Sequence, residues 1–525
     1  MLTEILIFAL TSILAYYWYV YKKIHNHFKE RDVKFLPGIP VFGNAYKSTC
    51  LKRHLMYDLE EVYTAFPDER YMGYVEGTKP VILVRDPELI KKITVKDFDH
   101  FLNHTDFFTQ EMEPLFSLTL IMMKDDKWKD MRTSLSPAFT GNKMKLMMPF
   151  IHEITNNIVD ALKAQNGKDV NLDDIMRRFT TDVIASTAFG LQVNSLNERD
   201  NEFFKCGQNL FNFNTFQKIY LFLCVQFPIF TKLTKLRLRP TKTTKFFTDI
   251  VTSTMEYREK NNVVRPDMIH LLMQLNKGTL ESSNSNPEKD VVGFATVQEE
   301  MKPRGKTREW TMPEIVGQAL TFFIAGFETT ASTATMCLHE LALNPEVQEK
   351  LYEEIKNFSE TIGKLSYENI NELKYLDCVL NETFRKWSAI VMMDRVCTKE
   401  YELPPPHEGG KPYKLRPGDL VYNIVNAIHM DPMYYPNPDV FDPDRFSEEN
   451  KPNIRPFTFM PFGMGPRACI GSRLALLELK MLFFTLILHF KVMKCPRTKD
   501  PIVLAADDFN IKCLGHTWLK FEPRS

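Results

Sequence analysis

One short stretch near the C-terminus carries the strongest signal in the chain: Pro461-Phe462-Gly463-Met464-Gly465-Pro466-Arg467-Ala468-Cys469-Ile470-Gly471. Its three glycines and two prolines predict a tight loop, and the residues from Ser472 to Phe490 have the pattern of an apolar helix. Cys469 therefore stands at the mouth of a helix, where the helix dipole and the nearby Arg467 favour the thiolate. A thiolate is a soft metal ligand that suits iron.

Two other interpretations of this stretch are weaker. A lone cysteine is most often a small buried hydrophobic residue, but such a residue needs neither the glycines nor the arginine around it. The segment from Gly463 to Ala468 also fits the dinucleotide-binding pattern G-x-G-x-x-A, which requires an acidic residue about 20 positions further on. No Asp or Glu lies between Glu478 and Asp500, so we reject this interpretation.

The loop resembles the haem-binding signature of the cytochrome P-450 monooxygenases, Phe-x-x-Gly-x-Arg-x-Cys-x-Gly, through Phe462, Gly465, Arg467, Cys469 and Gly471. The resemblance implies that Cys469 is the axial thiolate ligand of a haem b iron, which pushes electron density towards O–O cleavage. It also implies a mainly α fold with a small β region (α+β). The haem would lie between a long central helix and the cysteine-bearing loop and helix.

A second signal lies in the helical pattern of residues 311–343, which a capping box opens. Its apolar interior contains Ala325-Gly326-Phe327-Glu328-Thr329-Thr330. A glycine, a carboxylate and two hydroxyl groups are costly inside a buried helix, and such violations of local rules commonly mark function. The segment resembles the family's A-G-x-[DE]-T motif. By that resemblance the helix bulges over the haem beside Ala325 and Gly326, and Glu328 and Thr329 deliver protons during oxygen activation.

Further family motifs are spread along the chain. Trp128 and Arg132 stand four apart on one helix face and match W-x-x-x-R. The resemblance implies that these two donors hold the haem propionates together with Arg395 and Arg467. Glu382-Thr383-Phe384-Arg385 matches E-x-x-R, which implies a structural network with Arg445 beneath the haem loop. The family usually has one or two prolines after this motif, whereas this chain has Ser388-Ala389, and the effect on the pocket is left open.

The N-terminal segment has the composition of a membrane anchor. Residues 5–21 form a nearly unbroken apolar run that would span roughly 26 Å as a helix, which is short for a bilayer but suits the endoplasmic reticulum. The run ends in aromatic residues without a small-residue cleavage site, which disfavours a signal peptide, and the basic residues after it should stay cytosolic. We expect an anchor over residues 1–36 and a cytosol-facing catalytic domain over residues 37–525.

Composition limits the other function classes. The 66 basic and 66 acidic residues cancel, so we expect no nucleic-acid partner. The nine cysteines include no C-x-x-C pair, which indicates a reducing compartment without a disulfide framework. Two short runs, 71–75 and 81–84, predict a β-hairpin, which places the β region towards the N-terminal side.

Together these features predict a membrane-anchored haem-thiolate monooxygenase that inserts one oxygen atom from O₂ into a lipophilic substrate. The resemblance also implies that electrons come from an NADPH–cytochrome reductase, with a cytochrome of the b type as a second candidate donor. The chain looks most like insect microsomal members, which implies detoxification of plant toxins or insecticides. Oxidation of an endogenous hormone, pheromone or lipid is the enzymatic alternative. A haem-binding or sensor protein without catalysis is an alternative of another class, although it would not need Glu328 and Thr329.

Overall fold

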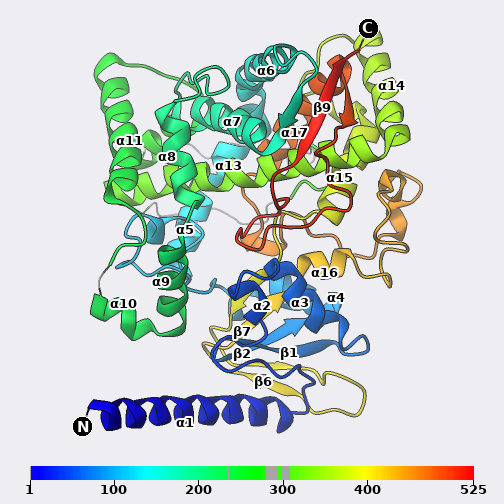
Figure 1. The fold of residues 1–525 in the computed structure, drawn as a ribbon. Coiled ribbons are helices and arrows are strands. Elements are labelled where there is room, and N and C mark those ends of the chain that lie inside the picture. Colours follow the sequence, from blue (N-terminus) through cyan, green and yellow to red (C-terminus); the bar gives the residue numbers. More distant parts are fainter. Residues whose placement is uncertain (1, 235, 279–291, 298–307, 525) are drawn as a thin grey trace.

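The computed structural model describes residues 2–234, 236–278, 292–297 and 308–524 of the chain. Helices form the upper body of the molecule, and many of the strands gather in the smaller lower part (Figure 1). This mainly helical α+β architecture confirms the predicted fold class. The helices of the upper body and of the side that carries α9 and α10 are α5 (Asp125–Leu135), α6 (Gly141–Lys163), α7 (Leu172–Ile184), α8 (Glu202–Phe211), α9 (Thr215–Gln226), α10 (Pro228–Thr234), α11 (Thr241–Asn261), α12 (Met268–Asn276), α13 (Met312–Leu343), α14 (Pro345–Thr361), α15 (Lys374–Lys386) and α17 (Ser472–His489). The lower part holds the short helices α2 (Tyr46–Thr49), α3 (Leu55–Thr64), α4 (Pro87–Lys91) and α16 (Val425–His429).

The long helix α13 crosses the upper body (Figure 1). The predicted capping box opens it, because the backbone N–H of Thr311 donates to the Glu314 carboxylate and the Thr311 side chain accepts in return. The helix ends where Pro345 would break its hydrogen-bond ladder. It is buried along most of its length because α7, α11, α12 and α15 pack around it. This helix is therefore held rigidly in the centre of the protein.

Four strands form the largest sheet, in the order β1 (Tyr71–Glu76), β2 (Lys79–Val84), β7 (Leu420–Asn423) and β4 (Met393–Val396). Strands β1 and β2 form the predicted antiparallel hairpin, and β2 runs parallel to β7. A second sheet contains β3 (Asp169–Asn171), β9 (Trp518–Pro523) and β8 (Phe490–Lys494), and a third pairs β5 (Tyr401–Leu403) with β6 (Tyr413–Leu415). The expected N-terminal position of the β region was therefore only partly correct. Most strands follow residue 390, and their pairing depends on distant segments.

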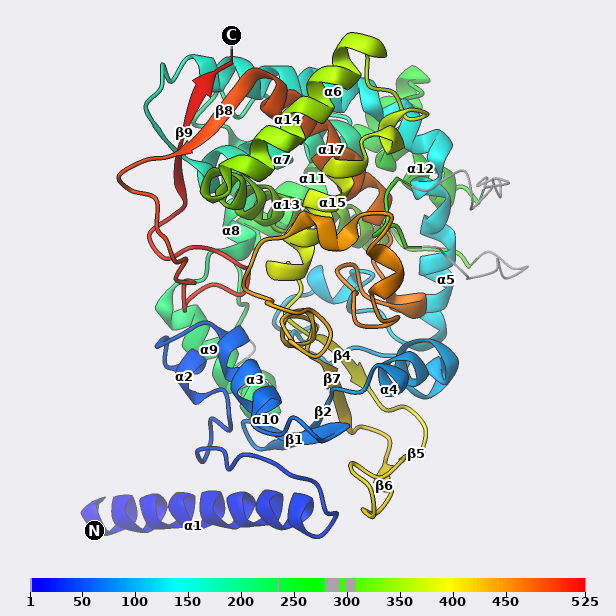
Figure 2. The same cartoon turned by 90° about the vertical axis from the view of Figure 1, so that its right-hand side faces the viewer.

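The N-terminal helix α1 (Leu2–Lys29) lies across the lower face of the molecule in both views (Figures 1 and 2). Its exposed first half contrasts with Ile24 and Phe28, which are buried in the core of the lower part. Phe28 lies so close to β1 that a Cβ added at Gly73 would be 2.7 Å from its ring. Packing of the lower part therefore reaches back to Ile24, before the boundary expected at residue 36.

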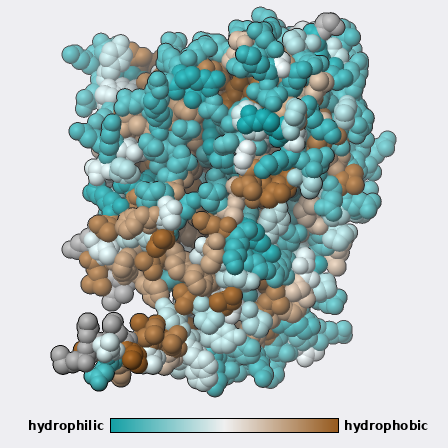
Figure 3. Space-filling model, in the orientation of Figure 1, coloured by the Kyte–Doolittle hydropathy of each residue, from teal (hydrophilic) through white to brown (hydrophobic). Residues whose placement is uncertain are grey.

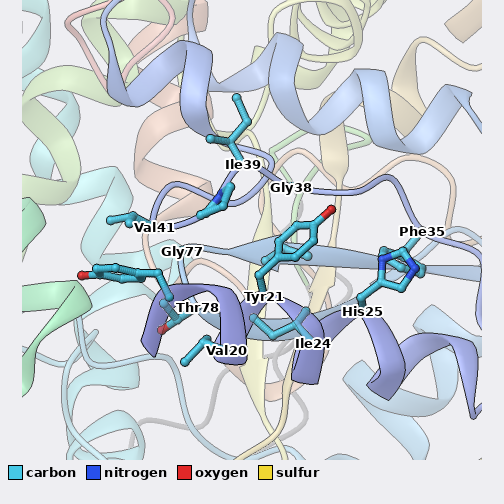
Figure 4. A pocket seen from close by; sticks show the side chains of 13 residues that line it. Val20, Tyr21, Ile24, His25, Phe35, Gly38, Ile39, Val41, Gly77 and Thr78 are labelled. Carbon is cyan, nitrogen blue, oxygen red and sulfur yellow. The ribbon is translucent and has the colours of Figure 1, made fainter. Parts of the chain in front are cut away.

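A small pocket marks the junction between α1 and the proline-rich segment that follows it (Figure 4). Tyr21, Ile24 and His25 line one side, and Ile39 and Val41 line the other. The cavity measures about 20 Å³, which is room for about one water molecule. It is a joint between two segments and is too small for an organic ligand.

Candidate functional site

The glycine-rich loop presents Cys469 directly before α17. Gly465 has a φ of +70°, and a Cβ there would lie 1.8 Å from the carbonyl oxygen of Thr94, so only glycine lets the loop pack on this turn. The backbone N–H of Cys469 donates to the Phe462 carbonyl at 2.8 Å, which closes the loop. Gly471 then caps α17. The local sequence thus fixes one cysteine at a helix N-terminus.

The surroundings of Cys469 act on its thiol in opposite directions. Burial raises the pKa of Cys469, whereas the backbone N–H of Gly471 and the positive charge of Arg132 lower it. The cation that acts on the thiol is thus Arg132 and not the nearby Arg467, which the sequence had suggested. The guanidinium of Arg467 instead donates to the carbonyl oxygens of Leu102 and Met123, both at 2.9 Å. A bound metal cation would deprotonate the thiol outright.

An arginine cluster lies next to the loop. Arg395 on β4 is only 2% exposed, and its Nε has no hydrogen-bond partner among the described residues. Burial lowers the pKa of Arg395 to about 10. Burial and the charge of Arg395 lower the pKa of Arg467 to about 8, with a further contribution from Arg132. The Arg467 guanidinium also lies 3.8 Å from the ring centroid of Trp128. These mutually repelling buried cations fit the carboxylates of a haem, because an anion would relieve their repulsion.

Two partners of this cluster were not predicted. Asp394 precedes Arg395 and is bound by His104 Nδ1 at 2.8 Å and by the backbone N–H of Thr105 at 2.5 Å. Its charge supports the protonated form of both Arg395 and Arg467. The only local sequence signal for Asp394 was its position next to Arg395, the arginine of the family pattern. His104 lies 290 residues away in the chain, so no local sequence signal pointed to it.

The polar segment of α13 has two faces. Ala325 is exposed and Thr329 is half-buried, although most of α13 is buried. The Thr329 hydroxyl donates to the Ala325 carbonyl at 2.6 Å. Glu328 is only 4% exposed and lies against α7, where Arg177 Nε and Nη2 donate to its Oε2 at 3.0 and 2.9 Å. Burial raises the pKa of Glu328, and the charge of Arg177 lowers it. The acid and the alcohol therefore point to different sides of the helix.

The bulge that the resemblance implied is not found in the described helix, because Met312–Leu343 is one continuous α-helix. In this structure Gly326 packs against another helix. A Cβ at Gly326 would lie 3.0 Å from Cδ1 of Ile184, so the glycine allows α7 to approach α13 closely. A glycine, which is unfavourable inside a helix, thus allows the packing of α7 on α13. The helical hydrogen bonds of α13 continue past it.

The E-x-x-R residues form a fully buried pair. Arg385 donates through Nε and Nη2 to both carboxylate oxygens of Glu382, each at 2.7 Å, and neither side chain is exposed. Arg445 Nε lies 3.5 Å from Glu382 Oε1 as an ion pair, and the backbone N–H of Asp442 donates to the same oxygen at 2.9 Å. The structure thus brings together the three residues that the sequence grouped.

The segment in place of the family's prolines is held by side chains. Ser388 is fully buried, and its hydroxyl donates to the Ile390 carbonyl at 3.0 Å. Trp387 Nε1 donates to Glu340 Oε1 at 2.7 Å, which ties the same turn to α13. These bonds restrain the turn that prolines would otherwise stiffen.

We predict that Arg395→Leu lowers haem occupancy. The substitution removes a buried cation, and one charge-assisted bond of about 1.5–3 kcal/mol corresponds to haem loss that is about tenfold to hundredfold faster. The measurement is the haem-to-protein ratio and the rate of haem transfer to a scavenging globin. Arg199→Leu is the control, because Arg199 is more than half exposed and pairs with Asp174 at the surface. Equal transfer rates in both variants would remove Arg395 from the site.

The chain is similar in sequence to known proteins over nearly its whole length. The family model described as Cytochrome P450 matches residues 33–512. Probable cytochrome P450 9f2 of Drosophila melanogaster is 38% identical, with 99% of this chain and 99% of that protein covered. Cytochrome P450 9e2 of Blattella germanica is 38% identical (99% and 98% covered), and cytochrome P450 6k1 of the same species is 33% identical (96% and 94% covered). The matched region contains the Cys469 loop, the arginine cluster and the polar segment of α13.

Proposed function

The chain belongs to the cytochrome P450 family, and from this premise we propose that it is a membrane-anchored monooxygenase of lipophilic foreign compounds. A member of this family is a monooxygenase whose haem is bound through an axial cysteine thiolate. The observation that carries our assignment of the ligand is the closed glycine-rich loop that ends in Cys469 beside buried arginines. None of the other eight cysteines lies in such a loop.

The residues that would hold the haem come from four parts of the chain. Cys469 would ligate the iron, and the guanidinium groups of the cluster would bind the propionates. When bound, the haem supplies activation of O₂, so that with two electrons and two protons one oxygen atom enters the substrate and the other leaves as water. The contacting residues that we assign are Trp128, Arg132, Ala325, Gly326, Arg395, Phe462, Gly465, Arg467 and Gly471.

Thr329 and Glu328 would divide the task of moving protons. The Thr329 hydroxyl lies on the accessible side of α13, and a rotation about its Cα–Cβ bond would free it from Ala325 to hold a water molecule. Arg177 opposes the effect of burial on the pKa of Glu328, and in this proposal the carboxylate accepts a proton and passes it on. To deliver a proton to the side of α13 that carries Thr329, the Glu328 carboxylate must leave Arg177 and bind water instead. Arg177 is therefore a positioning residue in this proposal.

We predict that Thr329→Ala separates electron use from product formation. NADPH consumption should continue, while product per NADPH falls by about tenfold or more because protons arrive too slowly, and hydrogen peroxide should rise in proportion. Thr333→Ala is the matched control, because the buried Thr333 bonds to the Thr329 carbonyl one turn further along. A Thr329→Ala ratio equal to that of the parent would assign proton delivery to another group.

Lipophilic substrates suit the aromatic surroundings of the site. Close to Ala325 on α13, Phe322 packs on Phe139 with ring centroids 5.8 Å apart, and Ile324 is only partly buried. Apolar and aromatic walls with few polar groups favour ligands that water solvates poorly. The deciding experiment is a panel of plant toxins, insecticides, hormones, pheromones and fatty acids, scored for spectral binding and for NADPH-dependent product with a reductase. Turnover restricted to the endogenous compounds would overturn the detoxification role.

Membrane anchoring through α1 and residence in the endoplasmic reticulum are part of the proposal. Within the described residues, α1 alone is long and apolar enough to cross a bilayer. Apolar side chains of α9 and α10 are also exposed, with Phe216 at 68% and Leu233 at 75%. Figure 3 shows brown, apolar surface on the side where α1, α9 and α10 lie. This side would face the membrane, with the rest of the chain in the cytosol beside its reductase.

We predict different results for two truncations. Removal of residues 2–19 should weaken binding to lipid vesicles but leave the unfolding temperature unchanged, because those turns are largely exposed. Removal of residues 2–35 also deletes Phe28, whose burial contributes about 2–3 kcal/mol, so the unfolding temperature should fall. Vesicle flotation and thermal unfolding of the holoprotein measure the two effects. Equal unfolding temperatures would show that the docked end of α1 adds no stability.

A further inference from the structure

A short segment between α12 and α13 in the sequence packs on two other helices, α15 and α17. This segment, residues 292–297, is called the strap below. It forms a closed turn, because the backbone N–H of Val292 donates to Thr296 Oγ1 and the backbone N–H of Thr296 donates to the Gly293 carbonyl, both at 3.1 Å. Val292 is fully buried and Ala295 is 9% exposed. The strap is therefore packed against the body of the protein.

Asp377 of α15 holds the first half of the strap. Its Oδ2 accepts from the backbone N–H of Phe294 at 3.0 Å, and its Oδ1 lies 3.1 Å from Nζ of Lys480, a buried residue of α17. A Cβ at Gly293 would lie 2.2 Å from the same Oδ1, so only glycine lets the strap come this close. The carboxylate cannot move aside without weakening its pair with a buried cation. The position of the strap is therefore fixed by an ion pair of the body.

The side chain of Phe294 reaches the beginning of the cysteine loop. Its ring stacks on Phe459 at an angle of 8°, with the ring centroids 5.7 Å apart. Phe459 also stacks on His429, whose Nε2 accepts from the backbone N–H of Met460. The loop begins at the next residue, Pro461. Phe294 therefore packs on the segment through which the chain enters the loop.

The last residue of the strap reaches the other end of the same loop. The backbone N–H of Val297 donates to Ser472 Oγ at 3.3 Å, and Ser472 is the first residue of α17 and only 2% exposed. The preceding residue, Gly471, directs its backbone N–H at Cys469. Gly471 has no side chain that could hold it, so its orientation depends on its neighbours. The strap thus contacts both ends of the loop that carries the cysteine.

We propose that the strap positions Cys469 by holding both ends of its loop, so that the Gly471 N–H stays directed at the sulfur. The inference rests on the proposed function only in taking Cys469 as the iron ligand. A hydrogen bond to a ligating thiolate draws electron density away from the iron and so raises the reduction potential of the haem. Phe294 and Asp377 are therefore positioning residues, which act on the ligand through the loop.

The strap borders open space, so its contacts can be altered without a change in the central core. A cavity of about 510 Å³ adjoins it, and Gly293, Phe294 and Thr296 line one part of that cavity. Phe294 itself is only partly buried. Substitutions at Gly293 and Phe294 should therefore release the strap and leave the helices of the body folded.

The test uses the full-length holoprotein and the variants Gly293→Ala and Phe294→Ala. The first forces the strap away from Asp377, and the second removes the stack on Phe459. In each variant the reduced carbon monoxide complex should lose the red-shifted absorption band of a thiolate-ligated haem about tenfold faster, because one aromatic contact changes an equilibrium by about that factor. The reduction potential should shift to a more negative value while the haem content stays equal to that of the parent.

A third readout and a control separate positioning of the loop from general loosening. Amide hydrogen exchange of residues 461–475 should rise in both variants. Phe358 of α14 is 5% exposed and packs edge-on against Phe484 towards the opposite end of α17, with ring centroids 5.7 Å apart. Phe358→Ala should therefore lower the unfolding temperature but leave the band-loss rate, the potential and the exchange of the loop unchanged.

The possible results decide between the two proposals. A band-loss rate and a reduction potential equal to those of the parent in both strap variants would overturn the role of the strap, as would an equal change in Phe358→Ala. If the exchange of the loop rises in both strap variants while the parent itself shows no thiolate-type band, the strap holds the loop and the assignment of Cys469 as the iron ligand fails.

Discussion

In the Cys469→Ser variant, the reduced carbon monoxide complex should lose the red-shifted Soret band of a thiolate-ligated haem, and monooxygenase activity should vanish. Serine is close in size to cysteine, so the loop should still close through the bond from residue 469 to the Phe462 carbonyl. Its hydroxyl is a hard donor that stays protonated near neutral pH and cannot push electron density to the iron as a thiolate does. The expected loss is therefore chemical, while the fold stays intact.

The control for this variant is another cysteine of similar burial. Cys469 and Cys495 are both half-buried, but Cys495 lies after β8, away from the glycine-rich loop. Cys495→Ser should keep the thiolate-type band and the activity. Absorption spectra of both reduced complexes, with haem content measured in parallel, decide the matter. A thiolate-type band that survives in Cys469→Ser would show that another residue is the ligand.

Short-range patterns predicted the parts of the fold that depend on neighbouring residues. The capping box at Thr311, the hairpin of β1 and β2, and the loop that closes before α17 each follow from a few adjacent side chains. The pair of Glu382 and Arg385 could also be predicted from the sequence, because residues three apart on a helix are neighbours. In each case the interacting atoms belong to one local segment.

Contacts between distant segments were beyond the sequence patterns. Arg177 binds Glu328 across 151 positions, and no spacing rule connects them. Gly326 looked like a place for the helix to open, but its missing Cβ makes room for Ile184 of another helix. Phe28 lay inside the expected anchor and turned out to fill a space above Gly73. A single side chain in the sequence does not show which distant surface it will meet.

The second large effect is expected for Arg385→Met, which should greatly reduce the yield of holoprotein. The substitution leaves the Glu382 carboxylate buried without its main partner and frees the carbonyl oxygens of His429 and Pro438, to which Arg385 donates at 3.0 and 2.7 Å. Breaking a buried pair in this way costs about 3–5 kcal/mol. Domains are commonly stable by only about 5–15 kcal/mol, so much of the protein should fail to fold.

The effect should reach the cysteine loop through His429. Burial and the charge of Arg385 lower the pKa of His429 to about 3, so the ring is neutral, and its Nε2 accepts from the backbone N–H of Met460 at 3.0 Å, just before the loop. Phe384 also packs on Phe462 of the loop, with ring centroids 5.1 Å apart. Loss of Arg385 therefore loosens both supports of the segment that carries Cys469.

Arg385→Lys tests geometry against charge. It keeps the charge but cannot form the two parallel bonds to Glu382, so it should also lose most of the holoprotein. Lys350→Met removes the exposed pair with Asp444 and should change stability by less than about 1 kcal/mol. Thermal unfolding and haem content of the three purified variants give the comparison. If Arg385→Met matches the parent in both, the Glu382 network does not support the cysteine loop, and the loop must be held by its own glycines and by Gly465 against Thr94 alone.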